Sequence, residues 1–171
     1  NFRKDSFQGD INVCKYYELF GLETTFQNEK LIIKKRNNFD YPKKIILDLK
    51  DNPDLAQTII VTAYGLNIPT KITGLSTLKL KETDRLEALR NELTNLGASC
   101  IIDHESIEFF KSNKLNKNYI INTYDDHRMA LAFAPLSVIF PIEIQDPKVV
   151  SKSFPEFWNI LEKLNFSIDF V

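Results

Sequence analysis

The sequence predicts an α/β fold built from a tandem repeat. Strand-like segments alternate with helical segments along the chain, which is typical of sheets covered by helices. The same order of elements, with the same glycine and proline positions, occurs twice and divides the chain into residues 1–75 and residues 76–171. The 171 residues are 43% hydrophobic and 12% aromatic, which is enough to bury one shared core.

The first unit starts with a short helix that ends at Gly21, since glycine readily adopts the left-handed conformation that closes a helix. An apolar helix with proline in its first turn follows later in the unit. In order, the expected elements are a helix at 11–20, strands at 24–27, 31–35 and 44–49, a helix at 53–64 and a strand at 69–73.

The second unit repeats this order. Its first helix carries an apolar stripe at helical spacing, Leu86, Leu89, Leu93 and Leu96, and ends at Gly97. The expected elements are a helix at 85–96, strands at 99–103, 107–110 and 119–121, a helix at 125–138 and a strand at 141–145. A Lys/Asn-rich solvated loop is expected at 111–118. We expect the apolar helices at 53–64 and 125–138 to be buried and the leucine-striped helices to cover the sheets.

A terminal helix and strand complete the second unit. The helix at 154–164 starts with Ser153, Pro155 and Glu156, a pattern that predicts a capping box with proline inside the first turn. A last strand is expected at 167–171.

Charge and composition exclude several classes of protein. Twenty-two basic and 23 acidic side chains give a net charge of −1, so no overall field favours nucleic acid or an anionic membrane. No stretch approaches the roughly 20 apolar residues of a membrane span, and no signal peptide is visible. Cys14 and Cys100 lack metal-ligand spacing and are expected to be free thiols in a reducing compartment, which indicates a cytoplasmic protein. The chain begins with Asn1 instead of Met, so we expect a fragment of a longer protein.

Charged residues gather where the predicted helices begin. Asp54, Arg85, the pair His127 and Arg128, and Lys152 lie at or just before four helix starts. Helix starts offer unpaired N–H groups and a positive partial charge, and guanidinium groups bind phosphate or carboxylate in a bidentate manner. We therefore expect a pocket in which Arg85, Arg128 and Lys152 bind such an anion. Asp54 and Glu82 are the carboxylates expected to transfer protons beside it.

Simpler interpretations exist for the single residues. Acids at helix starts, such as Asp54 and Asp126, often only complement the helix dipole, and an isolated arginine there often forms a surface salt bridge. His127 has no second histidine at ligand spacing, so zinc is not indicated, and a structural role is open. His104 is expected in an exposed turn, and Gln57 is expected to form hydrogen bonds in the core.

Two long motifs carry a resemblance to a known family. The chain reads KLKETDRL at Lys79–Leu86 and YDDHRMA at Tyr124–Ala130, with KSFP at Lys152–Pro155. In order and spacing these strings resemble the 5-enolpyruvylshikimate-3-phosphate synthase family, as do PDLAQT at Pro53–Thr58 and QGDI at Gln8–Ile11. The resemblance extends over nearly the whole chain.

The resemblance implies a cofactor-free, metal-free transfer of the carboxyvinyl group of phosphoenolpyruvate to the 5-hydroxyl of shikimate 3-phosphate, with release of phosphate. It implies that Asp54 binds and helps to deprotonate the attacking hydroxyl, and that Glu82 and Lys152 take part in proton transfer at the enolpyruvyl carbon. It further implies that phosphoenolpyruvate binds to Arg85, Arg128 and Lys152, with His127 beside them, and that Lys81 helps to bind shikimate 3-phosphate.

The implied fold is the enolpyruvyl transferase fold, an inverse α/β-barrel-like arrangement of tandem βαβαββ units in two domains. This chain corresponds to two of the three units of the C-terminal domain, so the N-terminal domain of the same protein is the expected missing partner. We expect a monomer. Thr77 stands where the family pattern more often has asparagine, which puts one contact with shikimate 3-phosphate in question. A non-catalytic anion-binding module of the same fold and a structural or protein-interaction domain remain the alternatives.

Overall fold

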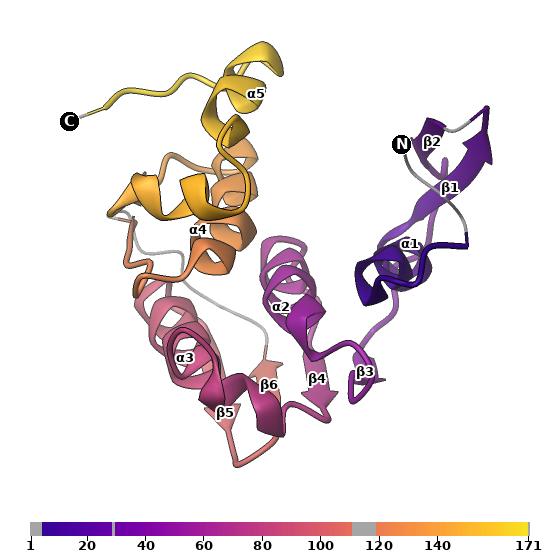
Figure 1. The fold of residues 1–171 in the computed structure, drawn as a ribbon. Helices are drawn as coiled ribbons and strands as arrows, with labels where there is room; N and C mark the ends of the chain where they lie inside the picture. Colours follow the sequence, from indigo (N-terminus) through magenta and orange to yellow (C-terminus); the bar gives the residue numbers. More distant parts are fainter. Residues whose placement is uncertain (1–4, 29, 111–118, 171) are drawn as a thin grey trace.

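The structure, a computed structural model, describes residues 5–28, 30–110 and 119–170. Within these ranges strands and helices alternate, as the sequence predicts (Figure 1). The central part of the chain is one four-stranded sheet in the order β3-β4-β6-β5. Its strands are β3 (Ile45–Asp48), β4 (Thr70–Thr73), β5 (Ser99–Ile102) and β6 (Ile107–Phe110).

Two helices connect the strands of this sheet. β3 and β4 are parallel and are joined through the short 3₁₀ helix η3 (Pro53–Leu55) and helix α2 (Ala56–Gly65). A further 3₁₀ helix, η4 (Ser76–Leu80), and helix α3 (Arg85–Asn95) lead from β4 to the antiparallel hairpin of β5 and β6. The order from β3 to β6 is therefore βαβαββ. The sheet takes strands from both sides of residue 75, and the division of the chain into units at that residue stays a prediction.

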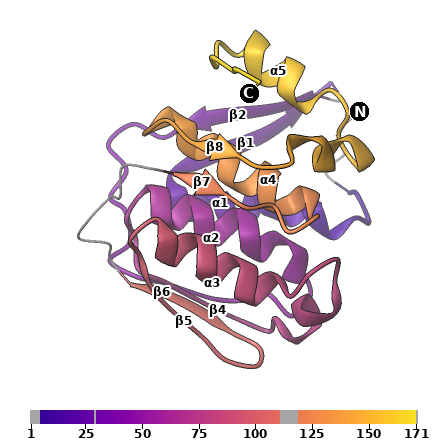
Figure 2. The ribbon, with the colours of Figure 1, turned by 90° about the vertical axis from the view of Figure 1, so that its left-hand side faces the viewer.

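The expected burial is confirmed for α2 and for the first part of the helix predicted at 125–138, whereas the end of that helix is exposed at Val138. Helices α2 and α3 lie between the four-stranded sheet and the layer that contains helix α4 (His127–Phe133) (Figure 2). Most side chains of α2 are buried, and α3 buries its leucine stripe. α4 continues as the 3₁₀ helix η5 (Ala134–Val138), because Pro135 has no N–H to continue the α-helical hydrogen bonding.

The N-terminal helix is present but is not a single α-helix. It consists of η1 (Gly9–Asn12), α1 (Val13–Tyr17) and η2 (Glu18–Phe20), and it ends at Gly21 with a φ of 78°. The two predicted strands follow as the antiparallel hairpin of β1 (Leu22–Gln27) and β2 (Lys30–Lys35).

The C-terminal region departs from the prediction. β7 (Ile120–Ile121) and β8 (Glu143–Ile144) form a short parallel pair, and a 3₁₀ helix that we did not expect, η6 (Pro147–Lys152), follows. The predicted capping box is wrong. The backbone N–H of Ser153 donates to the carbonyl of Val150 and closes η6, and α5 (Phe157–Lys163) begins after Glu156 without a side-chain cap.

The predicted last strand is also wrong over its described part, because residues 167–170 belong to no sheet, while Val171 lies outside the described residues. The predicted loop at 111–118 lies outside them as well. His104 is exposed in a turn, as expected. Both cysteines are free, as expected, and burial raises the pKa of the Cys100 thiol to about 12. No helix in the described part of the chain has the length and apolar character needed to cross a membrane.

Candidate active site

The start of α3 places an arginine inside the protein. The Asp84 carboxylate accepts hydrogen bonds from the backbone N–H groups of Leu86 (3.1 Å) and Glu87 (3.2 Å), so α3 begins at Arg85. The leucine stripe of the helix turns this first residue toward the core, and Arg85 is only 1% exposed. A buried guanidinium needs anionic partners, because an unpaired buried charge is strongly destabilising.

Three carboxylates from separate segments surround the Arg85 guanidinium. Arg85 donates through Nε and Nη2 to Asp126, through Nη1 to Asp54 (2.8 Å) and through Nη2 to Glu82 (2.6 Å). Asp126 is itself fully buried, whereas Asp54 and Glu82 are partly accessible to solvent. Arg85 therefore holds together the start of α3, the segment before α2 and the loop before α4.

Asp126 is positioned by a strained turn. Tyr124 and Asp125 adopt left-handed backbone conformations, with φ values of 54° and 56°, which cost of the order of 1–3 kcal/mol each for residues other than glycine. The turn directs the Asp126 carboxylate to Arg85 and to the backbone N–H of Arg128, 2.8 Å away, where it caps α4. His127 and Arg128 consequently begin α4, as predicted.

Cations cluster around Asp54. Besides Arg85, Lys81 places its Nζ 3.3 Å from the Asp54 carboxylate, and Arg128 places Nη2 3.9 Å from it. Arg128 also donates through Nη1 to the backbone carbonyl of Asp54, at 3.1 Å. The side chains of Lys81 and Arg128 are 33% and 27% exposed, so an anion from solvent can reach both.

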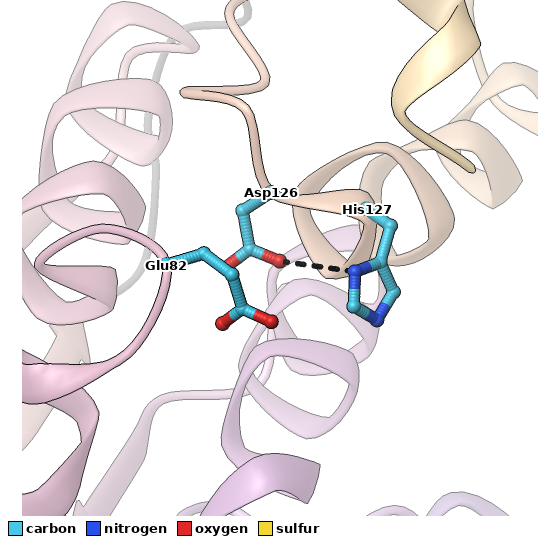
Figure 3. Close-up of side chains that lie close together, drawn as sticks. All are labelled: Glu82, Asp126 and His127. Carbon is cyan, nitrogen blue, oxygen red and sulfur yellow. Dashed lines mark ion pairs between the residues drawn. The ribbon is translucent and has the colours of Figure 1, made fainter. Parts of the chain in front are cut away.

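His127, Asp126 and Glu82 face one another beside this cluster (Figure 3). His127 Nδ1 lies 4.0 Å from Asp126 Oδ1, and one potential ligand atom from each of the three residues lies within 4.8 Å of the others. Such a group could in principle bind a cation. Here the Arg85 guanidinium already pairs with both carboxylates, and its charge would repel a metal ion.

The structure brings together six of the seven residues predicted for the site: Asp54, Lys81, Glu82, Arg85, His127 and Arg128. Lys152 is not among them. It ends η6 five residues before α5 begins, so the expectation that it precedes a helix start directly is wrong. Its side chain is exposed and pairs with no carboxylate of the described residues. Its catalytic role stays a prediction.

Two features of the site were not predicted. Arg85 is engaged by carboxylates and does not stand open for an anion, and Asp126, which we had considered as a dipole complement, is its most buried partner. The position of Asp126 before a helix signals a cap but not a contact with a side chain 41 residues away.

Gln57 is buried as expected, but its side-chain amide has no hydrogen-bond partner among the described residues.

Comparison with known proteins identifies the family in which these motifs occur. Residues 1–161 match the family model of EPSP synthase (3-phosphoshikimate 1-carboxyvinyltransferase). The chain belongs to the EPSP synthase family. A 3-phosphoshikimate 1-carboxyvinyltransferase of Bacteroides fragilis strain YCH46 is 40% identical over 168 residues, which are 96% of this chain and 40% of that protein. The enzyme of the same name from Pseudoalteromonas translucida is 37% identical over 163 residues, 94% of this chain and 37% of the relative.

A solved structure shows the same fold. The 2.37 Å structure of an EPSP synthase from Acinetobacter baumannii matches 89% of this chain and 38% of its own, with a TM-score of 0.61 at 20% identity. This likeness confirms the predicted enolpyruvyl transferase fold. The chain spans about two-fifths of the length of the EPSP synthase family relatives it matches.

Proposed function

We propose that this chain forms the C-terminal part of an enzyme that transfers the carboxyvinyl group of phosphoenolpyruvate to the 5-hydroxyl of shikimate 3-phosphate and releases phosphate. The reaction belongs to aromatic amino acid biosynthesis through the shikimate pathway. The observation that carries this proposal is the assembly of Asp54 and Glu82 around the buried guanidinium of Arg85, with Arg128 beside Asp54. All four residues belong to motifs typical of the EPSP synthase family.

The geometry suits a reaction between anionic substrates. Arg128 and Lys81 are the accessible cations beside the Asp54 carboxylate, so they can attract phosphate or carboxylate groups to it. Fixed cations near the place where charge accumulates are the kind of preorganised electrostatics that lowers such a barrier. Arg85 can contact an incoming anion only where Asp54 or Glu82 yields one of its hydrogen bonds, since both carboxylates occupy it here.

The proposed chemistry assigns one task to each side chain. Asp54 accepts the proton of the 5-hydroxyl of shikimate 3-phosphate while the hydroxyl oxygen attacks the enolpyruvyl carbon that carries phosphate. Glu82 and Lys152 move a proton to and from the neighbouring methylene carbon as the tetrahedral intermediate forms and loses phosphate. Arg85, Arg128, His127 and Lys152 bind phosphoenolpyruvate, and Lys81 binds shikimate 3-phosphate. No cofactor or metal ion enters these steps.

The proposal includes a partner and a compartment. The N-terminal part of the same protein supplies the remainder of the shikimate 3-phosphate site, because the chain spans about two-fifths of its relatives. The complete enzyme acts as a monomer in the cytoplasm, without nucleic acid or membrane partners. The isolated chain is expected to bind ligands weakly and not to turn over.

The test is phosphate release from phosphoenolpyruvate and shikimate 3-phosphate. This chain is mixed with the upstream part of its own protein after both pieces are shown to fold. Release that requires both pieces and both substrates supports the proposal. Release by this chain alone contradicts the expectation that the isolated chain does not turn over. The absence of release from folded, associated pieces favours a non-catalytic anion-binding module. The Arg128→Ala variant is the negative control, because it removes an accessible cation of the site and should reduce the rate.

A further inference from the structure

A second charged residue of α3 contacts the same loop as Arg85. Glu92 lies seven residues after Arg85, two helical turns along the same face, and it is fully buried. Its Oε1 accepts hydrogen bonds from the Tyr124 hydroxyl (2.7 Å) and from Nδ2 of Asn122 (3.2 Å). Its Oε2 accepts one from the backbone N–H of Asn122 (3.3 Å).

This environment is unusual for a carboxylate. Among the described residues Glu92 has no basic partner, and the hydrogen bonds to its carboxylate come from neutral donors of one loop. A buried carboxylate without a cation is expensive to keep, so a simple packing role would be filled more easily by an apolar residue. Burial and the hydrogen bond to Glu92 raise the pKa of Tyr124 to about 12, which keeps its hydroxyl protonated as the donor.

The contacts of Glu92 lie on one side of the strained turn. Glu92 accepts hydrogen bonds from Asn122, just before the turn, and from Tyr124, its first left-handed residue. Arg85 pairs with Asp126, directly after the second left-handed residue, Asp125. A left-handed tyrosine is uncommon and persists only where its surroundings fix it. The two ends of one rigid helical face thus fix both ends of the turn that sets the start of α4.

We infer that Glu92 is a positioning residue: through Asn122 and Tyr124 it fixes the turn that orients His127 and Arg128 toward their anionic substrate. The inference rests on the proposed function, because the substrate that Arg128 binds is taken to be phosphoenolpyruvate. A displacement of about 1 Å in a substrate-binding group can reduce catalysis by up to about a hundredfold. Glu92 therefore acts on binding and rate without touching the substrate.

Two conservative variants of the complete enzyme test this. Glu92→Gln keeps the shape but turns one acceptor into an NH₂ group that faces the donors of Asn122 or Tyr124. Tyr124→Phe removes one hydroxyl and keeps the ring. We expect each to raise the KM for phosphoenolpyruvate about tenfold while the KM for shikimate 3-phosphate stays within about twofold. The double variant should be no worse than the more affected single variant, since both remove the same contact.

The control is Glu87→Gln, the same substitution on the same helix. Glu87 is half-exposed and, in the part of the chain that the structure describes, forms its one ion pair with its helical neighbour Arg90, so its substitution should leave both KM values unchanged. Equal effects on both substrates, or unchanged KM values in folded Glu92→Gln and Tyr124→Phe enzymes, would overturn the inference and leave Glu92 a stabilising residue.

Amide hydrogen exchange of residues 120–130 separates this inference from the proposed function. Exchange should accelerate in the Glu92→Gln and Tyr124→Phe enzymes relative to Glu87→Gln. Glu92→Gln alters the acceptor of the Asn122 N–H, and both substitutions loosen the turn that positions Asp126, the acceptor of the Arg128 N–H. Unchanged exchange overturns the inference even in an active enzyme. Accelerated exchange in a protein whose unsubstituted form releases no phosphate supports the anchoring of the turn and overturns the proposed function instead.

Discussion

The surroundings of Arg85 and of Lys152 differ in how firmly the fold holds the two cations. Arg85 is 1% exposed and bound by Asp54, Glu82 and Asp126, whereas Lys152 lies exposed at the end of a 3₁₀ helix with no ion pair among the described residues. Both belong to motifs that resemble one enzyme family, yet only the first is built into the core of this chain.

The difference separates two kinds of site residue. A buried charge with several partners contributes to the free energy of unfolding as well as to chemistry, because its removal leaves those partners unpaired. An exposed lysine can be removed at little cost in stability, so its effect should be confined to function. Substitutions should therefore lower stability in the order Arg85, Asp54, Arg128 and Lys152.

Arg85→Leu should have the largest effect on stability. It leaves the fully buried Asp126 without its cation, and breaking a buried pair in this way costs about 3–5 kcal/mol. Urea denaturation of the complete protein measures the loss. Arg90→Leu is the matched control on the same helix, because Arg90 forms a partly exposed pair with Glu87 and should contribute about 1 kcal/mol or less. Similar losses in both variants would remove the distinction between the two regions.

The sequence predicted where the helices of the site begin but not which of their residues meet. The start of α3 was predictable because Asp84, the leucine stripe and Gly97 are local signals, and the starts of the helices at Asp54 and His127 followed for similar reasons. Local signals cannot show which starts meet in space. The contact of Arg85 with Asp126 joins residues 41 positions apart, and it depends on how α3 packs against the loop before α4.

The C-terminal errors have the same origin. Ser153, Pro155 and Glu156 match the local pattern of a capping box, but the backbone N–H of Ser153 closes η6 instead. The indole of Trp158 donates a hydrogen bond to the Pro147 carbonyl of η6, at 3.0 Å. Similarly, no local rule indicates that Tyr124 and Asp125 adopt left-handed conformations, because this turn lies between two contacts with α3, those of Tyr124 with Glu92 and of Asp126 with Arg85. Tertiary packing decided the details that short patterns could not.

Asp54→Asn should have an intermediate effect on stability and a large one on catalysis. The Asp54 side chain is about one-third exposed, so the loss of its pairs with Arg85 and Lys81 should lower stability by about 1 kcal/mol. The amide cannot accept the hydroxyl proton, so turnover should fall about 10²- to 10⁴-fold. Steady-state phosphate release measures this, with exposed Asp51→Asn as the control. A near-normal rate in the folded Asp54→Asn enzyme would contradict the role of Asp54 as the base.

Arg128→Ala should affect binding more than stability. Its side chain is 27% exposed and its ion pairs with the carboxylates of Asp54 and Asp10 are long, at 3.9 and 4.0 Å, so stability should change by less than about 1 kcal/mol. We expect the Kd for phosphoenolpyruvate to rise about tenfold or more, and that for shikimate 3-phosphate to change little. Calorimetric titration of the complete enzyme with each substrate measures both constants, and Arg36→Ala, which removes another partly exposed arginine, is the control. An equal rise in the Kd of both substrates would show that Arg128 does not bind phosphoenolpyruvate selectively.

Lys152→Ala should have the smallest effect on stability, within about 0.5 kcal/mol, because the side chain is exposed and unpaired among the described residues. Phosphate release should nevertheless fall strongly if Lys152 joins the site only when the complete enzyme binds its substrates. Lys148→Ala is the matched control, an exposed lysine in the same 3₁₀ helix, and it should retain activity. A Lys152→Ala enzyme with normal phosphate release would show that the motif around Lys152 serves the fold of this region, and that the Arg85 cluster carries the chemistry of this chain without it.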